Sequence, residues 1–391
     1  MTAKLLNNVW EPATTPLLHL PASDRPTAAM VDLGALGHNY QEVVRRAKGR
    51  KVLAVVKAQA YGHGAVRVSR RLLELGAHML GVALVEEGRE LREAGIDAPI
   101  LVMGSILPGQ AEAAAFLRLT PAVFTVPVAE AFSEAARKLK TKISVHVKID
   151  TGMGRIGVLP EDAPDFIAAL RGLPGLDVEG LMTHFADADL CDKQFASRQM
   201  DRFESLLREL AGRGIDIPVR HAANSAAMLD FPRALFTMVR PGLMLYGYDP
   251  VEGGTGDADL KPVMSLVTRI AFLKKVPAGV PISYGRTFVT KQESLIATLP
   301  IGYADGLSRA LSNRAEALVR GRRVPIAGRV CMDMCMIDVT EVPGVREGDE
   351  AVLLGSQGGE RITADEIALK TGTIPYEVLC GIGSRVPRIY Q

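Results

Sequence analysis

The sequence predicts an α/β protein in which a (β/α)8 barrel of the TIM type is followed by a mostly antiparallel β domain. From about residue 28 to 250, short β-branched and apolar runs alternate with longer amphipathic stretches, and strands without intervening helices follow. At 391 residues the chain exceeds the size at which one hydrophobic core stops growing, so two domains are expected. We place an N-terminal arm at 1–25, the barrel at 26–260 and the β domain at 261–391.

Eight short apolar runs in the first part are the candidate barrel strands, the number that a closed βα barrel requires. The runs are AAMVDL (28–33), KVLAVVKA (51–58), HMLGVAL (78–84), PILVMG (99–104), PAVFTV (121–126), ISVHVKID (143–150), DVEGLMTHF (177–185) and VRHAANS (219–225). Apolar residues at helical spacing predict helices between them. These helices are expected at 64–75, 109–119, 127–139, 161–170 and 192–214.

The pattern changes after a stretch rich in Gly and Asp at 250–262. The strand candidates that follow are SLVTRIAFLKKV, ESLIATLPI, EALVRGRRVPIAGRV, CMIDVTEV and EAVLLG. Only residues 362–371 are expected to form a helix in this part. Frequent short strands separated by turn signals are typical of a separate, largely antiparallel domain.

Composition argues against several classes of function. Lys and Arg number 46 against 44 Asp and Glu, a net charge of +2 without a dense basic block, so neither nucleic acid nor a membrane surface is an expected partner. No apolar run reaches the roughly 18 residues of a membrane span, and the first residues lack a signal-like segment. The 4 cysteines are too few and scattered for a disulfide framework or a zinc site. We therefore expect a cytoplasmic protein without a metal.

Polar residues at the ends of the predicted strands locate a candidate site. In an eight-stranded βα barrel, residues at the C-terminal strand ends line the active site. This rule brings to one mouth Lys57, Lys148, Asp150, His184, Asn224 and Ser225. A lone strand-end lysine usually extends into solvent, whereas a desolvated neutral lysine can form a Schiff base with a carbonyl cofactor. For Lys57 taken alone, both interpretations stay open.

Three further segments are suited to binding an anion. Asn224 and Ser225 offer side-chain and backbone donors, and Gly242 in RPGLMLYG allows a close approach of the backbone to a phosphate. The loop DTGMGRIG (150–157) delivers Arg155, whose guanidinium can bind an oxygen anion. A turn that needs glycine and an arginine that faces solvent are the simpler alternatives for each segment alone.

Taken in order, these segments resemble the alanine racemase family of pyridoxal phosphate enzymes, over roughly residues 26 to 390. The matching motifs are AVVKAQAYGHG, VKIDTGMGRIG, ANS, RPGLMLYG, ISYGRTF, PIGYADG, GRVCMDMCMIDV and TIPYEVLCGIGSRVPRIY. The resemblance implies a barrel followed by a β domain, pyridoxal 5′-phosphate as cofactor, and a homodimer in which each active site is completed by the other subunit. A two-fold interface then creates two equal sites.

The resemblance also implies catalytic roles. Lys57 carries the cofactor as a Schiff base, and Tyr284 reaches across from the partner chain. Racemisation needs acid/base groups on both faces of a planar carbanion, and these two residues are assigned to those faces. Arg240 faces the ring nitrogen and leaves it a hydrogen-bond acceptor, because an arginine only donates.

Further residues are implied to hold the cofactor and the substrate. The implied cofactor-binding residues are Lys57, Tyr61, Arg155, His184, Asn224, Ser225, Arg240, Gly242, Leu243 and Tyr376. Arg155 also contacts the substrate carboxylate, which Met332 and Asp333 of the partner chain flank. His221 orients Arg240. Lys148 matches a position that is often carbamylated, where the added negative charge steadies the neighbouring arginine.

The implied function is interconversion of L- and D-alanine for peptidoglycan synthesis, with a serine or broad-specificity racemase as the alternative. Tyr303 and Tyr376 resemble a pair of phenols that narrows the entrance, which favours a small substrate. A decarboxylase is expected to place a carboxylate where Arg240 stands, and a non-catalytic pyridoxal-binding barrel would not need the β domain. The chain departs from the family pattern at Gln59, where Asn is usual, and after Tyr284 at Arg286 and Phe288.

Overall fold

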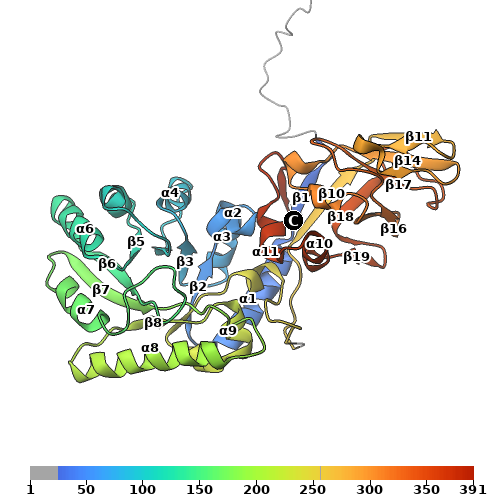
Figure 1. The fold of residues 1–391 in the computed structure, drawn as a ribbon. Helices are drawn as coiled ribbons and strands as arrows, with labels where there is room; N and C mark the ends of the chain where they lie inside the picture. The colour runs from blue at the N-terminus through green and yellow to red at the C-terminus, as the bar shows by residue number, and fades with distance from the viewer. Residues whose placement is uncertain (1–24, 256) are drawn as a thin grey trace, which may run out of the picture.

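Eight parallel strands form a barrel, and a separate, mostly antiparallel β region follows it (Figure 1). This architecture, seen in a computed structural model that describes residues 25–255 and 257–391, confirms the predicted fold class. Residues 1–24, which make up most of the predicted arm, lie outside the described residues.

The barrel strands follow one another in the order β8-β7-β6-β5-β4-β3-β2-β9. They are β2 (Lys51–Val55), β3 (Met79–Val82), β4 (Ile100–Val102), β5 (Thr120–Val123), β6 (Ile143–Lys148), β7 (Leu176–Met182), β8 (Val219–His221) and β9 (Met238–Val239). β8 and β9, the two ends of this order, lie side by side. Thr237 N donates to Arg220 O at 3.1 Å, and Arg240 N donates to Ala223 O at 2.9 Å. These bonds close the barrel.

The prediction that residues 28–33 form a barrel strand is wrong. They contribute β1 (Ala28–Val31), which pairs antiparallel with β10 (Met264–Arg269) and parallel with β20 (Arg388–Tyr390), both in the second region. In Figure 1, β1 lies beside β10 at a distance from the barrel. The eighth barrel strand is β9, whose two residues are too short to give a periodic pattern. Lys57 therefore follows the first barrel strand, not the second.

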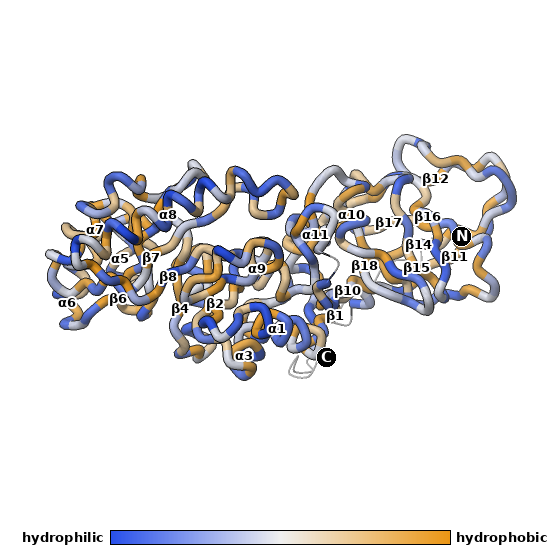
Figure 2. Tube along the Cα trace, turned by 90° about the horizontal axis from the view of Figure 1, so that it is seen from below, coloured by the Kyte–Doolittle hydropathy of each residue, from blue (hydrophilic) through white to orange (hydrophobic). Residues whose placement is uncertain are grey.

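Helices cover the outside of the barrel, and the short α2 lies at its mouth. They are α1 (Leu33–Ala47), α2 (Lys57–Tyr61), α3 (Ala65–Glu74), α4 (Val85–Glu93), α5 (Ala111–Phe116), α6 (Val126–Leu139), α7 (Ala163–Arg171), α8 (Gln194–Gly212) and α9 (Ser225–Asp230). Figure 2 shows hydrophobic and hydrophilic residues alternating along α8, as expected for a helix with one face on the core. The predicted helices are present, and α1, α2, α4 and α9 were not predicted.

The second region contains three sheets and two α-helices. Its larger sheet has the order β16-β15-β18-β10-β1-β20, with β19 beside β18; its smaller sheets are β11-β14-β17 and β12-β13. The new strands are β11 (Phe272–Val276), β12 (Pro281–Ile282), β13 (Phe288–Val289), β14 (Ser294–Leu299), β15 (Glu316–Val319), β16 (Arg322–Pro325), β17 (Cys335–Asp338), β18 (Glu350–Gln357) and β19 (Glu360–Ile362). The helices are α10 (Ala364–Thr371), which was predicted, and α11 (Pro375–Cys380), which was not.

Helix α11 is the part of the second region that reaches the barrel mouth. It packs so closely on α2 that a Cβ built on Gly62 would lie 2.3 Å from the carbonyl oxygen of Leu379. Only glycine fits there, and it also adopts the left-handed φ of 84°. The domain boundary near residue 260 stays a prediction, because β1 precedes the barrel in the sequence but pairs with β10 in the largest sheet of the second region.

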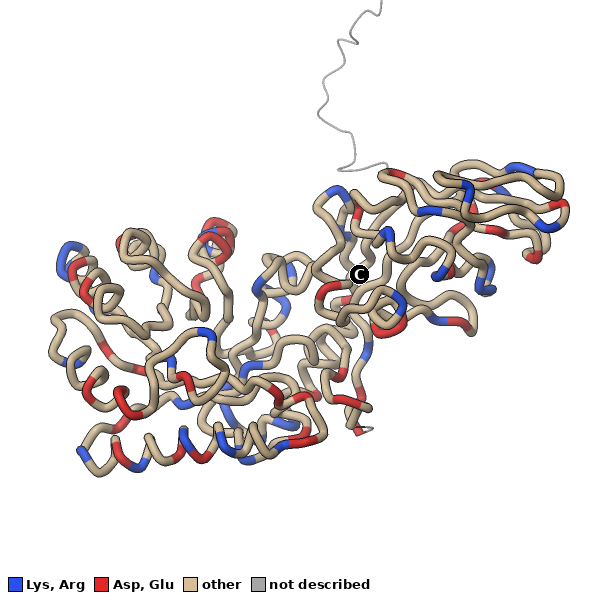
Figure 3. Tube along the Cα trace, viewed as in Figure 1, with Lys and Arg blue, Asp and Glu red and all other residues tan. Residues whose placement is uncertain are grey.

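Charged residues of both signs are spread over the surface, with acidic residues gathered on α4 (Figure 3). Within the described part of the chain, no helix combines the length and apolar character that crossing a membrane requires.

Candidate active site

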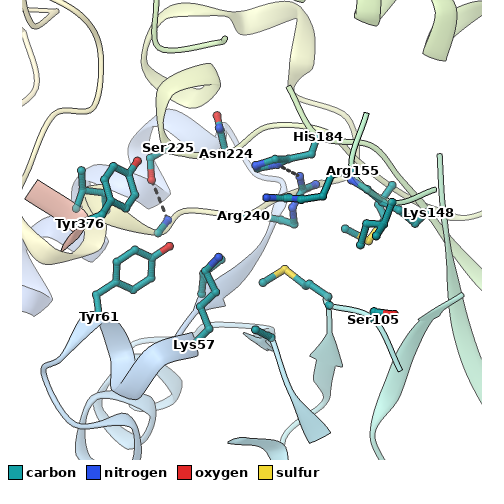
Figure 4. Close-up of a pocket in the computed structure, with 18 residues that line it drawn as sticks. Lys57, Tyr61, Ser105, Lys148, Arg155, His184, Asn224, Ser225, Arg240 and Tyr376 are labelled. Atoms are coloured by element: carbon teal, nitrogen blue, oxygen red, sulfur yellow. Dashed lines mark hydrogen bonds between the residues drawn. The ribbon is translucent and has the colours of Figure 1, made fainter. Parts of the chain in front are cut away.

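A pocket of about 410 Å³ lies at the C-terminal ends of the barrel strands. The predicted site residues that line it are Lys57, Tyr61, Lys148, Arg155, His184, Asn224, Ser225, Arg240, Gly242, Leu243 and Tyr376. In Figure 4, Tyr61, Tyr376 and Ser225 lie at one end of the pocket and Lys148 and Arg155 at the other. Lys57 points into the space between these two ends.

Lys57 stands at the start of an unusual backbone turn. The four residues after it have left-handed φ angles, with 52° at Ala58, 55° at Gln59, 52° at Ala60 and 54° at Tyr61. A left-handed conformation costs about 1–2 kcal/mol per residue that carries a Cβ, so neighbouring contacts must stabilise α2. Such strain is concentrated at functional sites, although none of these residue types predicts it.

Acidic residues of α4 hold this turn in place. Glu87 accepts a hydrogen bond from Ala58 N at 2.6 Å, and Glu90 accepts one from Gln59 Nε2 at 2.6 Å. Gln59 Oε1 accepts a bond from Ala65 N, the first residue of α3, at 3.3 Å. The residue that departs from the family pattern therefore connects the strained turn to α3 and α4.

The electrostatic surroundings favour a neutral Lys57. Burial and the positive charge of Arg155 lower the pKa of its amine, and Glu87 offsets part of this shift. A lysine with a lowered pKa is more often unprotonated at neutral pH, as a nucleophile or a base must be.

The Tyr61 end of the pocket presents hydrogen-bond donors. Ser225 Oγ accepts bonds from Gly242 N at 2.8 Å and Met244 N at 3.3 Å, which leaves its own proton to donate elsewhere. Within the described residues, the backbone N–H groups of Ser225 and Leu243 have no acceptor. Both stand at the start of a helical turn, where free N–H groups attract an anion.

Three neighbouring side chains, Tyr61, Asn224 and Tyr376, shape this end. A Cβ on Gly242 would lie 2.4 Å from the Tyr61 hydroxyl, so only glycine lets that phenol reach the donors. Asn224 lines the pocket and also caps α9, because its Oδ1 accepts from Ala227 N at 3.0 Å. Tyr376 lies beside Tyr61, with 5.9 Å between the ring centroids.

Arg240 is the most firmly held side chain of the pocket. Nη1 donates to His221 Nδ1 at 3.1 Å and to His221 O at 2.8 Å. Nη2 donates to Thr183 O at 2.8 Å, to Ala222 O at 3.0 Å and to His184 Nδ1 at 3.2 Å. Burial lowers the pKa of Arg240 to about 10, which leaves the guanidinium charged at neutral pH. Nε alone has no acceptor within the described residues, although the side chain lines the pocket.

The two histidines beside Arg240 are neutral. Burial and the positive charge of Arg240 lower the pKa values of His184 and His221 well below the ordinary value. Because an arginine only donates, the Nδ1 atom of each ring is the acceptor and the single proton is on Nε2.

Lys148 and Arg155 occupy the opposite end. Lys148 is only 3% exposed, and burial together with Arg240 and Arg155 lowers its pKa well below the ordinary value. Arg155 is exposed, on a loop that Asp150 Oδ1 fixes by accepting from Gly152 N at 2.9 Å and Gly154 N at 3.1 Å.

Apart from Tyr376, the predicted site residues of the second region do not line this pocket. Tyr284 is 70% exposed, Met332 is 52% exposed and Tyr303 is 42% exposed. Asp333 accepts a hydrogen bond from Arg385 at 2.7 Å, outside the pocket.

Several lining residues were not predicted, among them Met103, Gly104 and Ser105 after β4. The strand-end rule contains the signal for them, because the predicted strand 99–104 ends at this point. Glu87 and Glu90 carried no such signal, since acidic residues on a barrel helix are ordinarily solvated.

Comparisons with known proteins agree with this geometry. Residues 31–250 match the family described as alanine racemase, N-terminal domain, and residues 263–390 match alanine racemase, C-terminal domain. The chain belongs to the alanine racemase family. It is 50% identical over 368 residues to the alanine racemase of Halothermothrix orenii, covering 94% of this chain and 97% of that one. The alanine racemase of Carboxydothermus hydrogenoformans is 48% identical, covering 94% and 100%. The enzyme is therefore an isomerase that acts as an alanine racemase.

Solved alanine racemases share the fold. The Clostridium difficile 630 structure matches with a TM-score of 0.89 and 39% identity, covering 94% of this chain and 96% of that one. The Bacillus anthracis structure, solved with bound L-Ala-P, matches with a TM-score of 0.86 and 40% identity, covering 95% and 96%.

Proposed function

We propose that this racemase interconverts L- and D-alanine with pyridoxal 5′-phosphate held in the pocket by Lys57. The observation that carries the proposal is one pocket that contains an amine of lowered pKa, a group of anion donors and a fixed arginine (Figure 4). When bound, the cofactor supplies the electron sink that stabilises negative charge at the substrate Cα.

The residues present fit such a cofactor. Its phosphate would be held by Ser225, Tyr61 and Tyr376 and by the free N–H groups of Ser225 and Leu243, at the end where donors lack acceptors. Its ring nitrogen would accept from Nε of Arg240, the one guanidinium N–H direction that the protein leaves unused. His184 would lie behind the ring, where its contact with Arg240 limits its movement.

The two proton transfers are assigned to Lys57 and to the partner subunit's Tyr284. Lys57 Nζ removes or returns the Cα proton on one face, which its lowered pKa favours. The phenol does so on the other face. Tyr284 is 70% exposed within one chain, so it is accessible to the pocket of a second subunit in a homodimer.

The substrate carboxylate is assigned to Arg155 and to Met332 of the partner subunit, with Asp333 beside them. Tyr303 and Tyr376 would narrow the entrance to suit the methyl group of alanine. Because a neutral amine attacks carbon dioxide, the lowered pKa of Lys148 supports a carbamate there, formed with release of one proton. Carbon-13 NMR after addition of labelled carbon dioxide is expected to show one slow-exchanging carbamate signal that Lys148→Arg lacks.

We further propose that the product D-alanine supplies peptidoglycan synthesis in the cytoplasm. The 4 cysteines, all within the described residues, are free thiols, the state expected in a reducing compartment.

Two measurements test the proposal. Borohydride reduction of the purified enzyme, followed by peptide mapping, should fix the cofactor on Lys57; a label on another residue contradicts the assignment. Chiral chromatography after incubation with L-alanine, L-serine or L-lysine separately should show racemisation of alanine far above the others. Preference for serine would favour the broad-specificity alternative.

A further inference from the structure

A buried chain of side chains leads from Arg240 away from the pocket. Arg240 Nη1 lies 3.1 Å from His221 Nδ1, and His221 Nε2 lies 2.8 Å from His146 Nδ1. Both histidines are fully buried. The rings of His146 and His221 meet edge to face, with 4.9 Å between their centroids.

The direction of each bond follows from the arginine. A guanidinium has no acceptor, so His221 Nδ1 accepts and the single proton of this neutral ring is on Nε2. His221 Nε2 then donates to His146 Nδ1. A neutral His146 must in turn carry its own proton on Nε2, the atom that points away from Arg240.

Glu179 stands at the end of this chain. Its Oε2 lies 3.9 Å from His146 Nε2, and its side chain is 36% exposed. Within the described residues, His146 Nε2 has no hydrogen-bond partner, so the carboxylate is the acceptor that its proton faces. Interaction with His146 lowers the pKa of Glu179, which keeps the carboxylate ionised at neutral pH.

The backbone provides room for this arrangement. A Cβ on Gly180 would lie 2.5 Å from the His146 ring, which only glycine permits. The register between β6 and β7 also shifts between Val145 and His146, the point at which the ring enters the barrel.

We propose that His146 and Glu179 are positioning residues that hold His221 with its proton on Nε2 and thereby keep Arg240 in place as a donor to the pocket. The inference rests on the proposed role of Arg240 toward a cofactor. Without an acceptor at residue 179, His146 is free to move its proton to Nδ1. His221 then carries its proton on Nδ1, where two donors, Nδ1–H and the guanidinium, face each other.

Ring-nitrogen NMR of the holoenzyme tests the proposal directly. The chain has 7 histidines, so selective 15N-histidine labelling gives a small set of rings to assign. Wild type should show both His146 and His221 protonated on Nε2. Glu179→Ala should shift both rings toward Nδ1–H, and Glu179→Gln, whose amide oxygen still accepts, should restore the wild-type pattern. Asp177→Asn removes an exposed carboxylate from the same strand and is the matched control.

Kinetics of the same variants link the tautomers to the reaction. Glu179→Ala should lower kcat by roughly ten-fold, the order expected when the buried Arg240–His221 hydrogen bond is lost, with the KM for alanine unchanged. Unchanged tautomers in Glu179→Ala overturn the proposal, and so do changed tautomers with an unchanged kcat. Peptide mapping that fails to label Lys57 would instead contradict the proposed cofactor site, because the ring-nitrogen assignments do not depend on it.

Discussion

The barrel and the second region hold their predicted site residues in opposite ways. In the barrel, Arg240 makes five hydrogen bonds and Lys148 is only 3% exposed. In the second region, Tyr284 is 70% exposed and lies outside the pocket. One chain therefore fixes the groups that would bind a cofactor but leaves Tyr284, the proposed second proton-transfer group, largely exposed. An exposed tyrosine lowers the stability of one chain only slightly, and its ring would make apolar contacts with a second subunit that covered it.

The largest effect is expected for Lys57→Ala, which removes the amine from the barrel side. Loss of the nucleophile and of one acid/base group should reduce racemisation by at least about 10⁴-fold in a chiral assay. Lys51→Ala, at the exposed start of β2, is the matched control and should keep wild-type activity. Substantial activity in Lys57→Ala would show that the barrel does not supply the essential amine.

Tyr284→Phe tests the other side of the comparison. The loss of one positioned acid/base group should lower kcat by about 10²- to 10⁴-fold, with Cα-proton exchange affected chiefly for one enantiomer. Equal loss of exchange for both enantiomers would contradict the assignment to one face.

Mixing Lys57→Ala with Tyr284→Phe subunits tests whether the two sides meet between chains. Random pairing should restore roughly one quarter of the sites, because each mixed dimer contains one intact site. A mixture of Lys57→Ala with Arg240→Lys places both changes in barrels and should give no such gain. Failure of the first mixture would place both groups in the same chain.

Arg240→Lys tests how much the hydrogen bonds of Arg240 stabilise the barrel. A lysine cannot replace five guanidinium bonds, so the carbonyl groups of Thr183 and Ala222 lose their donor. We expect the free energy of unfolding to fall by about 2–4 kcal/mol in urea titrations. Arg233→Lys, at exposed ion pairs with Asp201 and Glu204, is the control and should cost less than about 1 kcal/mol. Equal losses of unfolding free energy in the two variants would mean that the buried bonds of Arg240 add no more stability than the exposed ion pairs of Arg233.

The smallest effect is expected for Gln59→Ala, in the left-handed turn after Lys57. It removes the bonds to Glu90 and Ala65, which should cost about 1 kcal/mol of stability and change kcat/KM by less than about ten-fold. Gln59→Asn should recover part of the loss, because asparagine tolerates the left-handed conformation better. Denaturant titration and steady-state assays measure both quantities, and wild-type values for Gln59→Ala would contradict the stabilising role.

Much of the pocket could be predicted because parallel strands bring their ends together. Lys57, Lys148 and His184 come from separate segments, yet the strand-end rule places them at one mouth, where the structure has them. Short motifs along the chain indicated the alanine racemase family, and the comparisons confirm that family.

Long-range pairing could not be predicted. The apolar run at residues 28–33 indicates a strand but gives no partner, and β9 is too short to be recognised. The left-handed turn after Lys57 depends on contacts with Glu87 and Glu90, which are distant in sequence. The role of Asn224 as a helix cap was missed because the same residue type serves both anion binding and capping.

The pairing of β1 has a consequence for the order of folding during synthesis. β1 leaves the ribosome long before β10 and β20 exist, so both of its edges stay unpaired during translation of the whole barrel. An unpaired strand can associate with other chains during that interval. β20 therefore completes a sheet that β1 begins, and a chain truncated before β20 would leave one edge of β1 open for the lifetime of the protein.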